Sequence, residues 1–162
     1  MKLNPATHLG SNRSGDRLTR KHRIRILLAD DNQQLRTALK RILESEAEYE
    51  VVGEACNGFE AVRMTQVCRP DVVIMDISMP QKNGLIATAE LTHDFPKVRV
   101  MIWSSHTDSP YVEQAIRAGA VGYLVKSGQA RIEIAIRAVA SGHTYFDPII
   151  AQHVPAKFQG VN

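Results

Sequence analysis

Apolar residues recur along this chain with two alternating periods. Short apolar runs bounded by polar residues predict buried strands, and they lie at residues 24–30, 49–55, 71–76, 98–103 and 121–125. Between these runs the spacing becomes helical, and it predicts helices over residues 33–46, 58–68, 85–94, 110–118 and 130–141. The apolar pattern of the second helix consists of Phe59, Val62, Met64 and Val67.

The alternation of five strands with five helices at short spacing decides the fold class. It predicts parallel βαβ units with right-handed crossovers, and therefore a doubly wound α/β sheet. A length of 162 residues suits one domain with a real core. The chain has no run of about 18 apolar residues and no apolar signal core, so we expect no membrane association and a cytoplasmic location. Cys56 and Cys68 form no metal-like spacing and are expected to be small buried residues.

The charge is concentrated at the N-terminus. Residues 1–23 hold six basic residues against Asp16 alone, a net of +5, which leaves −2 for the remainder of a chain whose total is +3. We therefore predict a disordered basic tail at 1–23, a folded domain at 24–148 and a short C-terminal tail or linker at 149–162. Neither end is expected to contribute to the core. The tail is either a solvated leader or a weak, salt-sensitive contact for nucleic acid.

Charged and hydroxyl side chains follow the predicted strands where each one ends. Asp30 and Asp31 end the first apolar run, Asp76 ends the third, Ser104 follows the fourth and Lys126 follows the fifth. Because the carboxyl ends of parallel strands meet at one edge of a sheet, these side chains are expected to share one pocket. Three carboxylates, a hydroxyl and an ammonium predict a site for a divalent cation and a phosphoryl group.

A local alternative exists for the first acidic pair. Asp30 and Asp31 stand just before the helix predicted at 33–46, where an aspartate often caps the first turn. The additional strand-end positions of Asp76 and Lys126 favour the functional interpretation over simple capping.

Five motifs occur in order at compatible spacings: LLADDN, NGFEA, RPDVVIMDISMPQKNGL, MIWSSH and AGAVGYLVKS. Together they resemble the receiver domain of bacterial two-component response regulators, and the tract AIRAVASGHTYFDP is similar to the end of the receiver in the NarL/LuxR-type subgroup. The resemblance covers roughly residues 24–148. It implies a flavodoxin-like, five-stranded parallel sheet of order 2-1-3-4-5 with five helices.

The resemblance also implies roles at the strand ends. Asp76 is the expected phosphoryl acceptor, with Mg²⁺ held by Asp30, Asp31, Asp76 and the backbone carbonyl of Ser78. Lys126 supplies positive charge to the phosphoryl oxygens.

A conformational switch is implied as well. Ser104 donates its hydroxyl to the phosphoryl group, and Tyr123 occupies the aromatic position that follows this motion. The alternative for Tyr123 is an ordinary tyrosine at the edge of the sheet. Two departures from the common pattern are Ser127, which replaces a proline, and His106, which either tunes dephosphorylation or lies in a solvated loop.

The function expected is that of a signalling module with self-catalysed phosphorylation and dephosphorylation, and not of a conventional enzyme. Its expected partner is a sensor histidine kinase or a phosphotransfer protein, and homodimer formation on phosphorylation stays open. A phosphatase of the haloacid-dehalogenase type would need a second acid where Ser78 stands. A truncated or degenerate DNA-binding regulator of the NarL/LuxR type is the remaining alternative. DNA binding is not expected without an output domain, because residues 149–162 are too short for a helix-turn-helix.

Overall fold

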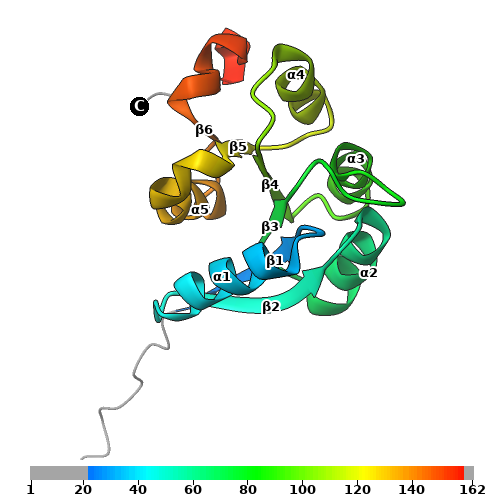
Figure 1. Cartoon of the computed structure of the whole chain (residues 1–162), viewed down its shortest axis with the longest axis vertical. Coiled ribbons are helices and arrows are strands. Elements are labelled where there is room, and N and C mark those ends of the chain that lie inside the picture. The colour runs from blue at the N-terminus through cyan, green and yellow to red at the C-terminus, as the bar shows by residue number, and fades with distance from the viewer. Residues whose placement is uncertain (1–21, 159–162) are drawn as a thin grey trace, which may run out of the picture.

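A parallel β-sheet with helices on both faces forms the core of the protein (Figure 1). The computed structural model describes residues 22–158, apart from the side chains of residues 128–130. The strand order is β2-β1-β3-β4-β5-β6, which confirms the predicted order 2-1-3-4-5 and adds one strand. The strands are β1 (Ile24–Ala29), β2 (Tyr49–Ala55), β3 (Val72–Met75), β4 (Arg99–Ser104), β5 (Gly122–Val125) and β6 (Tyr145–Phe146).

The five predicted helices are also present. They are α1 (Gln33–Glu44), α2 (Gly58–Cys68), α3 (Gly84–Asp94), α4 (Ser109–Arg117) and α5 (Ile132–Ala140), with three short 3₁₀ helices at η1 (Lys126–Arg131), η2 (Pro148–His153) and η3 (Ala156–Phe158). The side chain of Asn32 caps α1 by accepting from the backbone N–H of Leu35. The alternative that Asp30 and Asp31 form the cap of this helix is therefore wrong.

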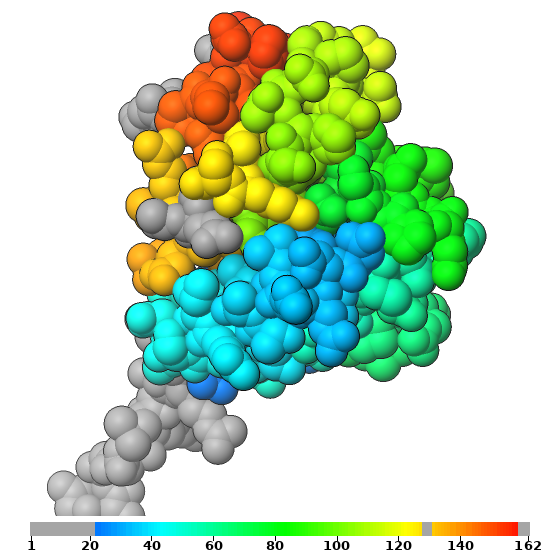
Figure 2. Space-filling model, in the orientation of Figure 1, coloured from blue at the N-terminus to red at the C-terminus, as the bar shows by residue number. Residues whose placement is uncertain are grey.

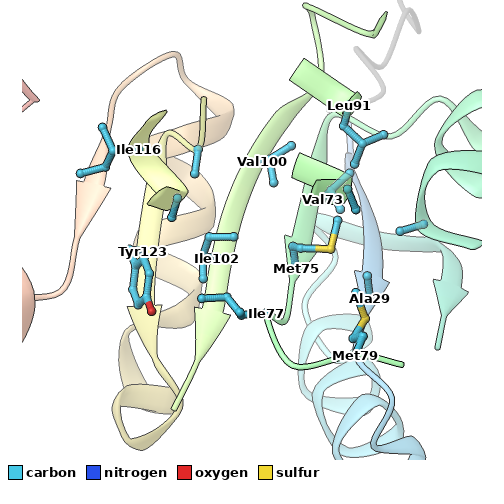
Figure 3. Packing of buried hydrophobic residues seen from close by; sticks show 14 of the residues in the cluster. Ala29, Val73, Met75, Ile77, Met79, Leu91, Val100, Ile102, Ile116 and Tyr123 are labelled. Atoms are coloured by element: carbon cyan, nitrogen blue, oxygen red, sulfur yellow. The ribbon is translucent and has the colours of Figure 1, made fainter. Parts of the chain in front are cut away.

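Successive residues of each strand point to opposite faces of the sheet and so contribute to two separate apolar layers. Leu27, Val73 and Tyr123 belong to the layer beneath α2, α3 and α4, whereas Ile26, Ile74 and Leu124 belong to the layer beneath α1 and α5. Figure 3 shows the first layer, in which residues of β3, β4 and β5 meet residues of α3 and α4. Because both faces of the sheet are covered, the strands read as continuous apolar runs.

Helix α2 buries only part of the face predicted, since Val62 and Met64 pack against the core but Phe59 and Val67 do not. Phe59 and Val67 are 56% and 70% exposed, while the small residues Ala61 and Thr65 are buried. Apolar periodicity pointed to the larger side chains because it ignores small residues, which allow the helix to approach the sheet closely. The two cysteines are unpaired and partly exposed, so they are less buried than expected.

The C-terminal segment packs onto the domain, against expectation. Ile150 is fully buried and Val154 is 4% exposed, and both lie in the layer beneath α2, α3 and α4. Figure 2 shows this segment, in orange to red, lying against α4. The prediction that neither end contributes to the core is therefore wrong for the C-terminal segment, as far as it is described, at residues 149–158. All but the last two residues of the predicted basic tail lie outside the described residues.

No helix within residues 22–158 combines the length and the apolar character needed to cross a bilayer.

Candidate functional site

The register of the strands brings the predicted site residues to one edge of the sheet. Ala29 of β1 pairs with Met75 of β3, so Asp30 and Asp76 each follow a paired position. Ser104 of β4 pairs with Val125 of β5, which places Lys126 one residue beyond that pair. The shared edge that the sequence predicted for these residues therefore exists.

Three carboxylates gather at this edge. Asp30 and Asp76 are only 3% and 4% exposed, whereas Asp31 is open to solvent. One carboxylate oxygen from each lies within 4.8 Å of the other two. Oxygen ligands at such spacing suit a hard divalent cation such as Mg²⁺, and two buried acids beside a third are poorly satisfied without additional positive charge. The residues present therefore fit a magnesium ion.

Lys126 is inserted between the two buried carboxylates. Its Nζ lies 2.8 Å from Asp30 Oδ2 and 3.2 Å from Asp76 Oδ1. Burial alone would lower the pKa of Lys126, but the two aspartates outweigh it and the pKa is raised. The ammonium therefore stays positively charged at neutral pH, between the two buried carboxylates.

The surroundings of Asp76 disfavour its charged form, whereas those of Lys126 favour the charged form. Burial raises the pKa of the Asp76 carboxyl, and the neighbouring Asp30 raises it further, while Lys126 only partly opposes them. Ionised Asp76 is thus held in an environment that disfavours its own charge. A buried acid with a raised pKa, placed at a strand end beside a charged partner, is typical of a functional group.

The loop after β3 is wound tightly around Asp76. The backbone N–H of Gly84, the first residue of α3, donates to the carbonyl of Ile77 at 2.9 Å. A Cβ atom at position 84 would lie 1.8 Å from the carbonyl oxygen of Asp76, so no side chain fits there. The glycine therefore lets the start of α3 approach the acidic site.

His106 contacts three of the predicted site residues, Ser78, Ser104 and Tyr123, and the sequence did not predict these contacts. Its backbone N–H donates to Ser104 Oγ at 3.2 Å, and its carbonyl accepts from the Tyr123 hydroxyl at 2.7 Å. Its ring is 2.8 Å from Ser78 Oγ and stacks on Tyr111 with the ring centroids 4.0 Å apart. The only cue in the sequence was a histidine two residues beyond the strand-end serine.

Ser104 and Tyr123 are both fully buried. Tyr123 does not lie at the edge of the sheet, because β6 pairs with β5 on its outer side. Whether it is an ordinary strand tyrosine or a switch residue stays a matter of prediction. Burial raises the pKa of the Tyr123 hydroxyl, which stays protonated and serves as a hydrogen-bond donor.

Comparison with known proteins decides the family. The family model described as "Response regulator receiver domain" matches residues 26–137. The chain belongs to the response regulator receiver family. A transcriptional regulatory protein DegU from Brevibacillus brevis is 38% identical over 139 residues, which are 85% of this chain and 59% of that protein. Response regulator GacA from Pseudomonas viridiflava is 37% identical over 83% of this chain and 63% of its own length.

Solved structures agree with this assignment and confirm the resemblance to the NarL/LuxR-type subgroup. A LuxR-family two-component response regulator from Aurantimonas sp. SI85-9A1 superposes with a TM-score of 0.77 at 34% identity, covering 82% of this chain and 95% of that one. The receiver domain of the putative response regulator NarL from Mycobacterium tuberculosis gives a TM-score of 0.72 at 30% identity, covering 75% and 98% of the two chains. This receiver spans about three-fifths of the length of the curated relatives it matches.

Proposed function

We propose that this receiver accepts a phosphoryl group on Asp76 from a histidine kinase, a phosphotransfer protein or a small phosphodonor, and that this changes its affinity for a partner. The observation that carries the proposal is the environment of Asp76. This buried carboxylate lies beside two other carboxylates and 3.2 Å from an ammonium. Phosphoryl transfer depends mainly on positioning and charge neutralisation, and both are supplied at this edge of the sheet.

The transfer step follows from the carboxylate chemistry. An oxygen of Asp76 attacks the phosphorus and forms a new O–P bond, which makes an acyl phosphate. The bond between phosphorus and the donor breaks, P–N for a phosphohistidine or P–O for acetyl phosphate, and its electron pair leaves with the donor. Since the attacking group is already ionised, Asp76 needs no base to remove a proton.

The remaining residues bind and orient. Asp30, Asp31, Asp76 and the carbonyl of Ser78 would hold Mg²⁺, which when bound neutralises charge between the acids and the phosphoryl oxygens. The ammonium of Lys126, now shared by Asp30 and Asp76, has the charge and reach to bind a phosphoryl oxygen on Asp76.

The switch starts from the contacts of Ser104 and Tyr123. Phosphorylation adds a charge of about −1.5 to −2 at Asp76. Ser104 is expected to turn its hydroxyl toward this charge, which ends its present bond with the backbone of His106. Because the Tyr123 hydroxyl is bonded to the same residue, a shift of His106 alters both. The equilibrium between two arrangements of the 104–124 region would then set partner affinity.

Phosphorylation with a small donor tests the acceptor directly. The chain is incubated with acetyl phosphate and Mg²⁺, and intact-mass spectrometry counts the phosphate added. The Asp76→Asn variant should take up none. Asp71→Asn is the matched control, because Asp71 precedes the same strand at its opposite end and binds the backbone N–H of Arg25 at 2.8 Å. Equal labelling of the Asp76→Asn variant would refute the assignment.

A second candidate function, transcriptional regulation, rests on the relatives. The name of DegU describes it as a transcriptional regulatory protein, and this chain covers 59% of it. For the 162-residue chain alone we expect only weak DNA binding that has no sequence preference and declines as salt rises. Sequence-selective binding at physiological salt, measured by fluorescence anisotropy, would favour the second candidate.

A further inference from the structure

Trp103 is the only tryptophan of the chain and lies at the end of β4, next to the switch residue Ser104. It is 2% exposed and packs in the layer beneath α1 and α5. The Nζ atom of Lys126 lies 5.6 Å from the centroid of its ring, within the range of a cation–π interaction. The ammonium that bridges the two buried carboxylates is therefore also in contact with an aromatic face.

This contact addresses a difficulty that a lysine brings to such a site. A lysine has a long flexible stem, and a compact charge on it can bind in many geometries. The two ion pairs attract Lys126 to the aspartates but do not define the path of its stem. A displacement of about 1 Å can slow a reaction by about 100-fold, so a rigid third partner is valuable.

An aliphatic side chain would pack in this apolar layer without burying a polar atom. The Nε1 atom of Trp103 is buried and has no hydrogen-bond partner among the described residues. An unpaired buried N–H group is unfavourable, and leucine or methionine would avoid it. What the indole adds at this position is the negative face of its ring, close to the only cation that contacts Asp76 in the described part of the chain.

We propose that Trp103 is a positioning residue for phosphoryl transfer, and that its indole face holds the Lys126 ammonium where it meets the phosphoryl oxygens. The proposal rests on the function proposed above. It assigns no direct contact between Trp103 and the reacting atoms.

Fluorinated tryptophans provide the sharpest test, because a single tryptophan means that biosynthetic labelling changes only position 103. Fluorine weakens the negative ring face with little change in size. The initial rate of phosphorylation by acetyl phosphate should fall stepwise from tryptophan through 5-fluoro- and 5,7-difluoro- to 5,6,7-trifluorotryptophan. The total fall should be about 2- to 30-fold, the range that corresponds to a cation–π energy of about 0.5–2 kcal/mol. Equal rates throughout the series would overturn the proposal.

Substitutions separate the role of the ring from that of packing. Trp103→Leu should slow phosphorylation, and Trp103→Phe should restore part of the rate because it retains an aromatic face. Leu43→Ala is the control for packing, since Leu43 is a fully buried residue of the same layer and its truncation also leaves a cavity. A control that slows the reaction as much as Trp103→Leu would show that general loosening of this layer is the cause, against the proposal.

A stability cycle tests the contact without any phosphorylation. Urea unfolding of the unchanged chain, Trp103→Leu, Lys126→Met and the double variant should show non-additive effects of at least about 2-fold in the unfolding equilibrium constant. Additive effects would overturn the contact and the proposal with it. The two proposals can fail separately. If the chain shows this coupling but never takes up phosphate, the contact between Trp103 and Lys126 exists, while the proposed function is refuted and so is a role of Trp103 in phosphoryl transfer.

Discussion

Asp76 and Asp147 are about equally buried, at 4% and 5% exposure, and each directly follows a strand and lies near one basic side chain, yet their other neighbours differ. Asp147 accepts from the backbone N–H of Ile149 at 3.2 Å, caps η2 and lies 3.6 Å from Arg131. Asp76 shares its surroundings with a second buried carboxylate, and its pKa is raised, first by burial and then by Asp30. The polar partners of Asp147 therefore satisfy its carboxylate, whereas the neighbours of Asp76 make its charged form less favourable.

The difference extends to the two regions around these residues. The acidic edge concentrates like charges and depends on Lys126 to compensate them. The C-terminal segment instead contributes buried apolar area through Ile150 and Val154. A region that gathers like charges around a buried acid is a candidate for chemistry, whereas a region with paired polar groups and buried apolar residues serves the fold.

The largest expected effect that separates the two regions is on metal binding. Asp31→Ala should abolish Mg²⁺ binding, because it removes one of the three clustered carboxylates and the one that solvent reaches most easily. Isothermal titration calorimetry measures this. Asp147→Asn should bind Mg²⁺ like the unchanged chain, and unaltered binding by Asp31→Ala would refute the site.

The second largest expected effect is a loss of stability when the C-terminal segment is altered. Ile150→Ala should lower the free energy of unfolding by about 2–5 kcal/mol, because it leaves a cavity at a fully buried position. Ile149→Ala is the matched control: the neighbouring side chain is 58% exposed, and the change should stay within about 0.5 kcal/mol. Urea unfolding compares them, and equal effects would show that the segment does not pack as described.

A smaller loss is expected at the satisfied aspartate. Asp147→Ala removes the cap of η2 and the partner of Arg131, and should cost about 1–2 kcal/mol. Asp147→Asn retains an oxygen that can accept from Ile149, so it should recover most of this. If both variants unfold like the unchanged chain, Asp147 would be no more structural than a surface residue.

The acidic edge could be predicted from the sequence because each of its residues follows an apolar run. Strand ends converge by topology alone, so Asp30, Asp76 and Lys126 needed no knowledge of side-chain conformation. The contacts of His106 and the ring of Trp103 beneath Lys126 depend on rotamers, which leave no periodic pattern.

The packing of the C-terminal segment could not be predicted from the sequence for a related reason. A two-residue strand is too short to show alternation, and the spacing of Ile150 and Val154 in a short segment gave no amphipathic face long enough to recognise. Their burial is a consequence of tertiary packing beside α4. The domain boundary at residue 148 itself stays a prediction.

The smallest expected effect is the change in stability caused by the titration of Asp76, and it depends on pH. The ordinary pKa of an aspartate here is 3.8, and that of folded Asp76 is higher, chiefly through burial and then Asp30. Between these two values the folded domain retains a proton that the unfolded chain has released, so stability falls as pH rises through this window and the loss is complete above it. Asp76→Asn has no such titration. Without divalent cations it should therefore raise the Tm at pH 7.5, and the gain should shrink toward pH 3.8.

Thermal unfolding followed by circular dichroism in EDTA measures this difference between the variant and the unchanged chain. The titration of Lys126 does not interfere, because its pKa is raised from 10.5 and its contribution is lost only in more alkaline solution. Excess Mg²⁺ provides the control, since a ligand that binds only the folded chain stabilises it and should reduce or reverse the advantage of the variant. A variant that is less stable at pH 7.5, or a difference that does not change with pH, would mean that Asp76 is as well satisfied as Asp147.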